Sequence, residues 1–590
     1  PAIVEEYMGK INEVTGRNYQ LFNYYGAPDA EQVIIAMGSV CDTIEETIDY
    51  MLAQGKKVGL VKVRLYRPFS VDAFVSAIPE TVKKITVLDR TKEPGALGEP
   101  LYLDVVAALK QAGKFQDVPV FTGRYGLGSK DTNPAQIIAV YNNTEKPRFT
   151  IGIEDDVTGL SLPIGENPNT TPEGTTCCKF WGLGSDGTVG ANKNSIKIIG
   201  DHTDMYAQAY FAYDSKKSGG VTISHLRFGK SPIKSTYFVN KANFVACHNP
   251  SYIDKYDMVE DVVPGGSFLL NCQWTVDELD EKLPAPVKAY IAKNNINFYI
   301  INAIKVAKEI GLGNKTNTVL QSAFFSIANI IPAEDAIEYM KKAAYKSFAK
   351  KGDDIVKMNY AAIEKGAGEV IKVDVPASWA DAEGTLPVHT ATGDRKDLVD
   401  FVNNILIPVN AQRGDKLPVS TFVGMADGTF PQGSAAYEKR GIAVDVPEWI
   451  PENCIECNQC SFVCPHAVIR PVILSEEEAA KAPAGAKMKD AMGLPGMKFA
   501  MVTSVLGVCA QVCPSKNKAL VMKSLDSQMN EQPMFDYAVK EVADKPEVHE
   551  KFKETTVKGS QFKQPLLEFS GACAGCGETP YAKLITQLFG

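Results

Sequence analysis

The stretch Cys454-Ile-Glu-Cys457-Asn-Gln-Cys460-Ser-Phe-Val-Cys464-Pro465 holds four cysteines within twelve residues. The spacing Cys-x2-Cys-x2-Cys-x3-Cys-Pro places the first three thiolates on one tight loop, where they can converge on one face of a metal cluster. The fourth cysteine precedes a proline that starts a new segment, so its side chain points away from the other three. The stretch therefore predicts ligands for two different clusters, and it requires a second group of cysteines elsewhere in the chain.

This spacing is typical of [4Fe-4S] clusters in bacterial ferredoxins. A zinc ribbon or scattered core thiols are the alternative, but zinc ribbons lack the third close cysteine and the Cys-Pro ending. Further along, Cys509 and Cys513-Pro514 repeat the second half of the motif. A complete second motif would have cysteines at 503 and 506, where Thr503 and Leu506 stand.

Two explanations account for the incomplete second group. Either one cluster is lost, or a segment of about five residues with two cysteines, between Val505 and Val508, is absent from this copy of the sequence. The second explanation is favoured, because Cys464 would otherwise have no cluster to ligate.

Length and composition limit the function classes. A chain of 590 residues predicts about three to five domains, and 45% hydrophobic and 22% charged residues are ordinary globular values. The net charge of −8 and the absence of a Lys/Arg cluster argue against nucleic-acid binding. No apolar run reaches the ~20 residues of a membrane helix. No signal peptide is present, so a cytoplasmic protein is expected.

The cysteines are unevenly distributed. Of 13 cysteines, eight lie between 454 and 576 in Cys-x2-Cys or Cys-x3-Cys pairings, which indicates metal ligands in a reducing compartment. The others are expected to be ordinary buried thiols, and His248 is expected to be an ordinary buried histidine; these cysteines are Cys41, Cys177, Cys178, Cys247 and Cys272. The chain opens at Pro1 without methionine and stops at Gly590 within an expected helix, so we expect a piece of something larger.

The first 150 residues alternate between strand and helix patterns. Strands are expected at 33–37, 58–65, 85–88 and 119–122, and helices at 42–54, 71–78 and 103–111. This alternation predicts a parallel, doubly wound sheet. Gly38-Ser39 and Asp89-Arg90 follow strands, where ligands bind in such sheets, but they could equally be turn and capping residues. Residues 151–176 read as a linker.

A glycine-rich loop opens the next segment. Gly182, Gly184 and Gly187 complete G-x-G-x-x-G, and Asp201 follows a strand expected at 196–199. Only eight residues separate Gly187 from that strand, too few for the crossover helix of a dinucleotide site. A weaker prediction remains, in which the loop's N–H groups contact an anion and Lys193 adds charge. The alternative is a tight turn that packs strand against helix.

Later segments carry fewer signals. The basic stretch from His225 to Lys234 could contact phosphates or be a solvated loop, and 335–350 is an amphipathic scaffold helix. Cys573 and Cys576 form a third Cys-x2-Cys, which suits a third cluster if two more thiolates come from elsewhere. A thioredoxin-like pair is the alternative, but the preceding strand is missing. Glu578 is a candidate for hydrogen bonding or proton transfer beside a cofactor.

Several stretches together resemble the pyruvate:ferredoxin (or flavodoxin) oxidoreductase family in its single-chain form, over essentially all 590 residues. They are Gly26–Asp29, Val63–Phe69, Thr91–Gly95, Lys179–Gly200, Gly428–Gly433, the run from Ile450 through the four cysteines, and Cys573–Tyr581.

The resemblance implies an α/β multidomain fold that matches the central portion of the family. It implies a transketolase-C-terminal-like domain with linker, a gamma-type domain associated with coenzyme A, a small connecting domain, a ferredoxin-like 2[4Fe-4S] domain and the start of a thiamine-diphosphate domain. The expected limits are 1–176, 177–388, 389–429, 430–546 and 547–590.

The resemblance also implies an enzyme of the pyruvate synthase class in anaerobic metabolism. It would convert pyruvate and coenzyme A to acetyl-CoA and CO2, using thiamine diphosphate with Mg²⁺, and pass electrons through three [4Fe-4S] clusters to ferredoxin or flavodoxin. A cytoplasmic homodimer without membrane or nucleic-acid partners is expected. The implied cluster ligands are Cys454, Cys457, Cys460, Cys464, Cys509, Cys513, Cys573 and Cys576. The implied cofactor contacts are Gly182, Gly184, Ser185, Gly187, Lys193, Glu578 and Thr579, with Glu578 as the catalytic candidate.

The sequence departs from the family pattern in three places. The family's first domain would precede Pro1, most of the thiamine-diphosphate domain would follow Gly590, and two cysteines are missing near 503–506. Either other chains supply these parts or the sequence is a portion of a longer polypeptide, which is favoured. Alternative functions are a related 2-oxoacid:ferredoxin oxidoreductase with another substrate, an iron–sulfur electron-transfer module without an active site, and a non-catalytic structural fragment. The last leaves the cysteine spacing unexplained.

Overall fold

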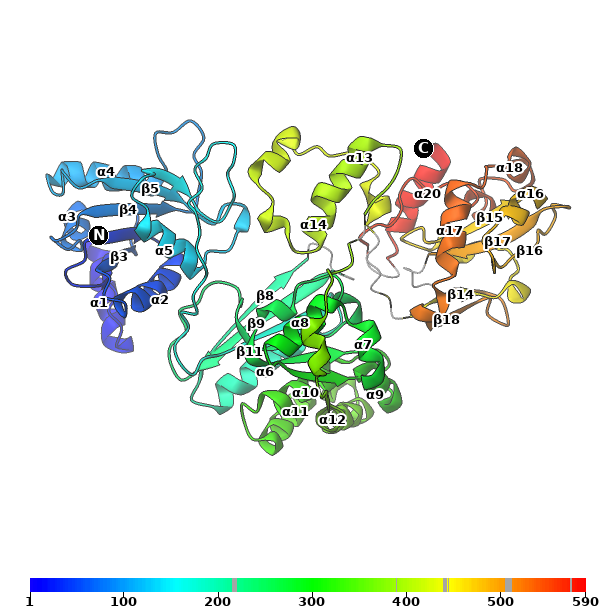
Figure 1. Cartoon of the computed structure of the whole chain (residues 1–590), viewed down its shortest axis with the longest axis horizontal. Helices are drawn as coiled ribbons and strands as arrows, with labels where there is room; N and C mark the ends of the chain where they lie inside the picture. The colour runs from blue at the N-terminus through cyan, green and yellow to red at the C-terminus, as the bar shows by residue number, and fades with distance from the viewer. Residues whose placement is uncertain (215–219, 389, 439–442, 444, 505–511, 573–575) are drawn as a thin grey trace.

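The computed structural model describes residues 1–590 except 215–219, 389, 439–442, 444, 505–511 and 573–575. Three units that contain β-sheets follow one another along the chain (Figure 1). Among the described residues, no helix is long and apolar enough to cross a membrane.

The first unit is built on a sheet with strand order β1-β3-β2-β4-β5-β6. Only β1 runs antiparallel to its neighbour; the other strands of the sheet are parallel. The predicted parallel α/β sheet is confirmed, and β1 and β6 are edge strands that the sequence pattern did not reveal. The strands are β1 (Phe22–Gly26), β2 (Gln32–Ala36), β3 (Val58–Val63), β4 (Lys84–Asp89), β5 (Val120–Arg124) and β6 (Arg148–Thr150).

Helices cover both faces of this sheet, because its central strands are apolar on both sides. In β2, Ile34 and Ala36 pack under α2 (Val40–Leu52) and α5 (Pro134–Asn142). Val33 and Ile35 pack on the opposite face with the remaining helices, which are α1 (Ala2–Thr15), α3 (Val71–Ser76) and α4 (Pro100–Ala112).

Asp89 lies at the carboxyl end of β4 and caps α4. Its carboxylate accepts the backbone N–H groups of Leu101 at 3.0 Å and Tyr102 at 3.2 Å. These N–H groups have no acceptor within the helix, so a carboxylate there stabilises the first turn. Of the two interpretations of Asp89, capping is the one that the structure supports.

The second unit holds a sheet with order β13-β12-β11-β10-β7-β9-β8, in which β7, β10, β11 and β12 are parallel. Its strands are β7 (Thr176–Leu183), β8 (Tyr206–Tyr213), β9 (Val221–Gly229), β10 (Ala242–Cys247), β11 (Val262–Asn271), β12 (Asn297–Ile301) and β13 (Ile371–Lys372). Its helices are α6 (Thr188–His202), α7 (Leu279–Lys282), α8 (Ala285–Lys293), α9 (Ala303–Ile310), α10 (Asn317–Ala328), α11 (Ala333–Phe348) and α12 (Asp353–Gly368).

The strand expected at 196–199 is wrong, because these residues lie inside α6. A short apolar run fits a strand and a buried helix equally well. The helical period decides here, since α6 buries Ala191, Ser195, Ile198 and Ile199, which recur at helical spacing. Asp201 is accordingly a helical residue, so the resemblance to a dinucleotide fingerprint fails for this reason too.

Glu46 of α2 fastens the second unit to the first. Its carboxylate is 3% exposed and accepts hydrogen bonds from the hydroxyls of Thr170, Ser235 and Tyr237. Thr170 belongs to the segment between the two sheets, and Ser235 and Tyr237 lie between β9 and β10. One buried carboxylate therefore joins three segments of the chain.

Between the second and third units, the residues that the structure describes form only short helices, in agreement with the weak periodicity of that region. These include α13 (Lys396–Phe401) and α14 (Ile407–Asn410), which a π-helical turn connects. Arg413 pairs with Asp257 and thereby ties this region to the second unit.

The third unit contains two small antiparallel sheets, β14-β18 and β15-β17-β16. Its strands are β14 (Asp445–Trp449), β15 (Ile469–Leu474), β16 (Lys489–Asp490), β17 (Lys498–Thr503) and β18 (Leu520–Ser524). Its helices are α15 (Gln459–Phe462), α16 (Glu476–Lys481), α17 (Glu531–Lys540), α18 (Pro546–Lys551), α19 (Val557–Ser560) and α20 (Thr579–Phe589).

Candidate metal centre

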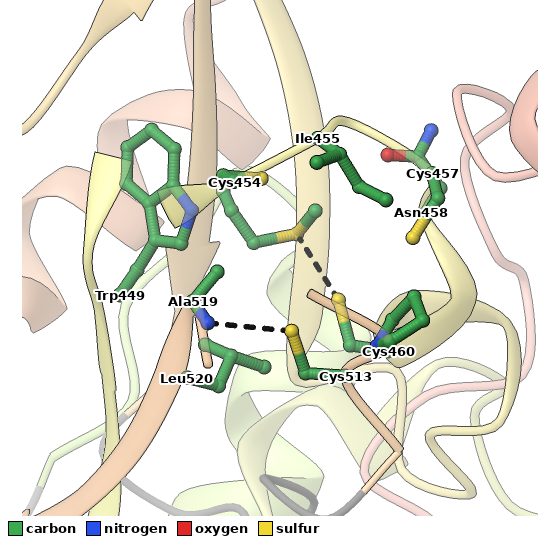
Figure 2. Close-up of a pocket in the computed structure, with 11 residues that line it drawn as sticks. Trp449, Cys454, Ile455, Cys457, Asn458, Cys460, Cys513, Ala519 and Leu520 are labelled. Atoms are coloured by element: carbon green, nitrogen blue, oxygen red, sulfur yellow. Dashed lines mark hydrogen bonds between the residues drawn. The ribbon is translucent and has the colours of Figure 1, made fainter. Parts of the chain in front are cut away.

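Four cysteines surround one cavity in the third unit (Figure 2). Cys454, Cys457 and Cys460 come from the segment between β14 and the first turn of α15, and Cys513 precedes β18. Pairing of β14 with β18 places Trp449 opposite Leu520, which brings the two segments together. The other residues that line the cavity are Trp449, Ile455, Asn458, Met501, Pro514, Ala519 and Leu520.

The spacing of the cysteines favours a cluster over a single ion at this cavity. Within the described residues, no three Cys, His, Asp or Glu side chains are close enough together to bind one ion. Four thiolates on one Zn²⁺ would each lie about 2.3 Å from it, whereas a cluster spreads its ligands over several irons.

The cavity also supplies hydrogen-bond donors to the cysteine sulfurs, and its lining is largely apolar. The backbone N–H of Ala519 lies 3.3 Å from Cys513 Sγ, and that of Glu456 lies 3.5 Å from Cys454 Sγ. Such N–H groups stabilise thiolate sulfur when it carries cluster charge. Burial raises the pKa of the Cys460 thiol to about 12, and neighbouring Cys454 and Cys457 add to the rise. Metal binding must therefore displace the proton.

Cys464 lies apart from this cavity, as its place before Pro465 predicts. It is 1% exposed and packs in the apolar core of the third unit.

Thr503 ends β17 opposite Ile469, and its hydroxyl donates to the carbonyl of Pro447. Thr503 therefore has a structural role, as the last residue of β17 and as a hydrogen-bond donor to the segment of β14. Leu506 and Cys509 lie outside the described residues, so the second cluster group stays a prediction.

Residues 569–572, which precede the third Cys-x2-Cys pair in the sequence, are hydrogen-bonded to the residues that follow Cys464. Phe569 N–H donates to the His466 carbonyl at 2.9 Å, and Ser570 Oγ donates to the Pro465 carbonyl at 2.9 Å. The His466 ring is hydrogen-bonded to the Ala572 carbonyl at 2.8 Å. The backbone of residues 569–572 is thus fixed beside the backbone that follows Cys464.

Cys576 and Glu578 lie where α20 begins. Thr579 Oγ1 donates to Cys576 Sγ at 3.2 Å, and this bond, with the N–H groups of Thr579 and Glu578, lowers the pKa of the Cys576 thiol. A lowered pKa favours the thiolate, the form that ligates metal. Glu578 is exposed and precedes the helix. Cys573 lies outside the described residues, and a catalytic role for Glu578 stays a prediction.

The glycine loop of the second unit has the geometry of a packed turn. Gly187 has φ 92° and starts α6, and a Cβ on Gly182 would lie 2.5 Å from Thr188 Oγ1. The Asp186 carboxylate accepts the N–H groups of Leu183 and Thr188, and Gly184 N–H donates to Gly220. These donors are used within the protein, which favours the packing alternative over an anion cradle.

The other predicted cofactor contacts of this loop are at its surface. Ser185 has φ 72° and is exposed. Lys193 is also exposed, with its Nζ 5.3 Å from the centre of the Phe211 ring. Their contact with a cofactor remains a prediction.

Two side chains of the basic stretch His225–Lys234 are held by contacts within the protein, Arg227 inside the second unit and Lys234 against the first. Arg227 is 3% exposed and donates to Gln208 Oε1 and the Ser235 carbonyl. Lys234 pairs with Glu45 and Asp49 of α2. Because both side chains bond to other parts of the protein, neither belongs to a solvated loop and neither is placed to contact a phosphate. The sequence pattern could not show it, because the acidic partners come from a distant helix.

The cysteines outside the clustered region are buried, as expected. Cys41, Cys177, Cys178, Cys247 and Cys272 are each at most 5% exposed, and burial raises the pKa of each thiol. Sequence reasoning missed two features near the clustered cysteines. Met501 Sδ lies 4.0 Å from Cys460 Sγ, and Lys583 of α20 is buried against α15. Neither residue belongs to a motif that would have indicated it.

Comparison with family models assigns most of the chain. Residues 177–369 match the model "Pyruvate ferredoxin/flavodoxin oxidoreductase", and 30–137 match "Pyruvate:ferredoxin oxidoreductase core domain II". Residues 447–470 match a 4Fe-4S binding domain, which includes the first four clustered cysteines. Residues 389–443 match a domain of unknown function.

Curated relatives match over the whole chain. A pyruvate-flavodoxin oxidoreductase of Enterobacter agglomerans is 55% identical over 600 aligned residues, covering 100% of this chain and 50% of its own length. A pyruvate:ferredoxin oxidoreductase of Moorella thermoacetica is 55% identical over 602 residues with the same coverage. A solved pyruvate oxidoreductase subunit from Thermotoga maritima shares 17% identity and a TM-score of 0.28, over 34% of this chain and 99% of its own. By its sequence, the chain belongs to the pyruvate:ferredoxin/flavodoxin oxidoreductase family and spans about half the length of the curated relatives that it matches.

Proposed function

We propose that the chain is part of an enzyme that oxidatively decarboxylates pyruvate. Pyruvate and coenzyme A give acetyl-coenzyme A, CO2, one proton and two electrons, and the electrons pass singly through [4Fe-4S] clusters to ferredoxin or flavodoxin. The observation that carries the proposal is the meeting of four cysteines around one cavity, in a chain 55% identical to proteins named for this reaction.

The chain's own contribution is electron transfer. Cys454, Cys457, Cys460 and Cys513 hold the first cluster, and Cys464 with Cys509 contributes to the second. Cys573 and Cys576 contribute to a third, and Ser570 and Ala572, which precede them, are hydrogen-bonded to the residues that follow Cys464. Thiamine diphosphate with Mg²⁺, when bound, supplies the carbanion stabilisation that decarboxylation needs.

The remaining expectations complete the proposal. The enzyme is a cytoplasmic homodimer of anaerobic metabolism, with Glu578 and Thr579 near the thiamine and the 182–193 loop near coenzyme A. Its domains are 1–176, 177–388, 389–429, 430–546 and 547–590. The separate sheets β1–β6, β7–β13 and β14–β18, which fall largely within the first, second and fourth ranges, support these limits.

Anaerobic iron and sulfide analysis with EPR spectroscopy tests the cluster assignment. We expect Cys513→Ala to lose about four irons per chain relative to the parent protein, because one cluster loses a ligand. Cys177→Ala is the matched control, since it removes a buried thiol of the second unit and should leave the iron content unchanged. Equal iron content in Cys513→Ala and the parent would refute the site.

Turnover tests the reaction. We expect reduction of ferredoxin or flavodoxin that requires both pyruvate and coenzyme A, and faster turnover of pyruvate than of 2-oxobutyrate. A protein with full iron content that reduces its acceptor with neither 2-oxoacid would be an electron-transfer module only. A preference for the larger substrate would assign it to a sister activity.

A further inference from the structure

A buried lysine lies against the turn between Cys460 and Cys464. Lys583 is 1% exposed, and its Nζ donates to the carbonyls of Ser461, Phe462 and Cys464. The first two carbonyls belong to the four-residue α15. The last carbonyls of a helix receive no hydrogen bond from N–H groups of the same helix. Lys583 therefore caps this turn from another part of the chain.

The capping geometry requires a charged side chain. Three carbonyls accept from one nitrogen, and only the protonated ammonium has three N–H donors. A full positive charge is thus held in the interior, between two cysteines that the motif assigns to different clusters.

The charge is held in a fixed position. One turn after Lys583, Gln587 accepts from Gln561 Nε2 at 3.1 Å, and Gln561 accepts from Ser461 Oγ at 3.0 Å. Gln587 also donates to the Lys563 carbonyl at 2.8 Å. Ser461, Gln561 and Gln587 are each at most 5% exposed, so water does not compete for these bonds.

We propose that Lys583 is a positioning residue whose charge raises the reduction potential of the cluster that Cys460 ligates. The inference rests on the proposed cluster sites. Reduction adds one electron and no proton to a cluster, so a fixed cation nearby stabilises the reduced form. The same lysine orders the turn from which both cysteines project.

Potentiometric titration of the full chain under anaerobic conditions, followed by EPR, tests this role, with dithionite as the electron donor. The test variants are Lys583→Met, which removes charge and donors, and Lys583→Gln, which removes the charge but keeps an N–H donor. Lys583→Arg keeps the charge. Lys84→Met is the matched control, because Lys84 caps the end of α5 in the first unit through the carbonyls of Tyr141 and Asn143.

With iron content preserved, we expect both neutral variants to lower the ratio of reduced to oxidised cluster at least about tenfold at a fixed potential. That shift is about 59 mV for a one-electron couple. Lys583→Arg and Lys84→Met should titrate like the parent. Unchanged potentials in both neutral variants at full iron content would overturn the proposal.

Other outcomes are also decisive. Loss of iron from both neutral variants, with iron retained in Lys583→Arg, would overturn the electrostatic role and leave Lys583 as a structural cap. Absence of iron and EPR signals from the parent would instead refute the proposed clusters. The two failures are therefore distinguishable.

Discussion

Replacing Glu46 by alanine should loosen the docking of the second unit on the first. The Glu46 carboxylate accepts from Thr170 Oγ1 at 2.5 Å and Tyr237 Oη at 2.5 Å, and also from Ser235 Oγ. Alanine would leave these three hydroxyls facing an apolar methyl group in a buried place. Glu46→Gln is the matched variant, because its amide oxygen can still accept.

The magnitude follows from the bonds that are lost. A hydrogen bond to a charged group contributes about 1.5–3 kcal/mol, and bonds that share one acceptor are not additive. We therefore expect Glu46→Ala to cost about 3–5 kcal/mol of docking free energy. Since 1.4 kcal/mol is a factor of ten, the undocked population should rise roughly a hundredfold to a few thousandfold. Glu46→Gln should cost about 1–2 kcal/mol.

Amide hydrogen exchange measures this opening directly. The N–H of Phe238 donates to Asp131 of the first unit, so it exchanges when the two units separate. We expect its exchange to accelerate strongly in Glu46→Ala, while the amides of β10, which lie within the second sheet, keep their parental rates. Exchange at Phe238 within twofold of the parent would refute the reasoning.

Three further substitutions test the packing of the first two units. Gly187→Ala should cost about 1–3 kcal/mol, because Gly187 has φ 92° and a Cβ there would lie 2.9 Å from Asn317 Cγ; denaturation followed by tryptophan fluorescence measures it. Phe324→Ala should cost about 3–5 kcal/mol in the same assay, since Phe324 is 1% exposed and contacts three other phenylalanine rings. Burial lowers the pKa of Lys84 to about 8, so the unfolded chain binds more protons between pH 8 and 10.5 and stability rises with pH there. Lys84→Met should remove this rise, measured as the difference between thermal midpoints at pH 7.5 and 9.5.

Each of these predictions has a contradicting outcome. Gly187→Ala or Phe324→Ala at parental stability would mean that the turn or the core relaxes without cost. A parental pH slope in Lys84→Met would show that the slope comes from other groups. Gly190→Ala is a suitable control for the loop, because a Cβ at Gly190 meets nothing within 4 Å.

Local spacing alone determined the character of the cysteine region and of the first sheet. Three thiolates that converge need only a short loop, so Cys454, Cys457 and Cys460 are interpretable without a fold. Likewise, apolar runs at strand spacing, separated by helical periods, predict a doubly wound sheet. The strand at 196–199 failed because a short apolar run does not distinguish the two periods.

Tertiary structure alone decided which distant residues meet. Cys513 reaches the first three cysteines through the pairing of β14 with β18, and Lys234 serves an interface whose acidic partners lie in α2. The clearest case is α20, which exposes Tyr581, Ile585 and Phe589 and buries Lys583 and Gln587. Periodicity would bury the apolar face. The polar face is buried because it satisfies carbonyls and amides of α15 and its neighbours, and those groups become acceptors only once the chain has folded.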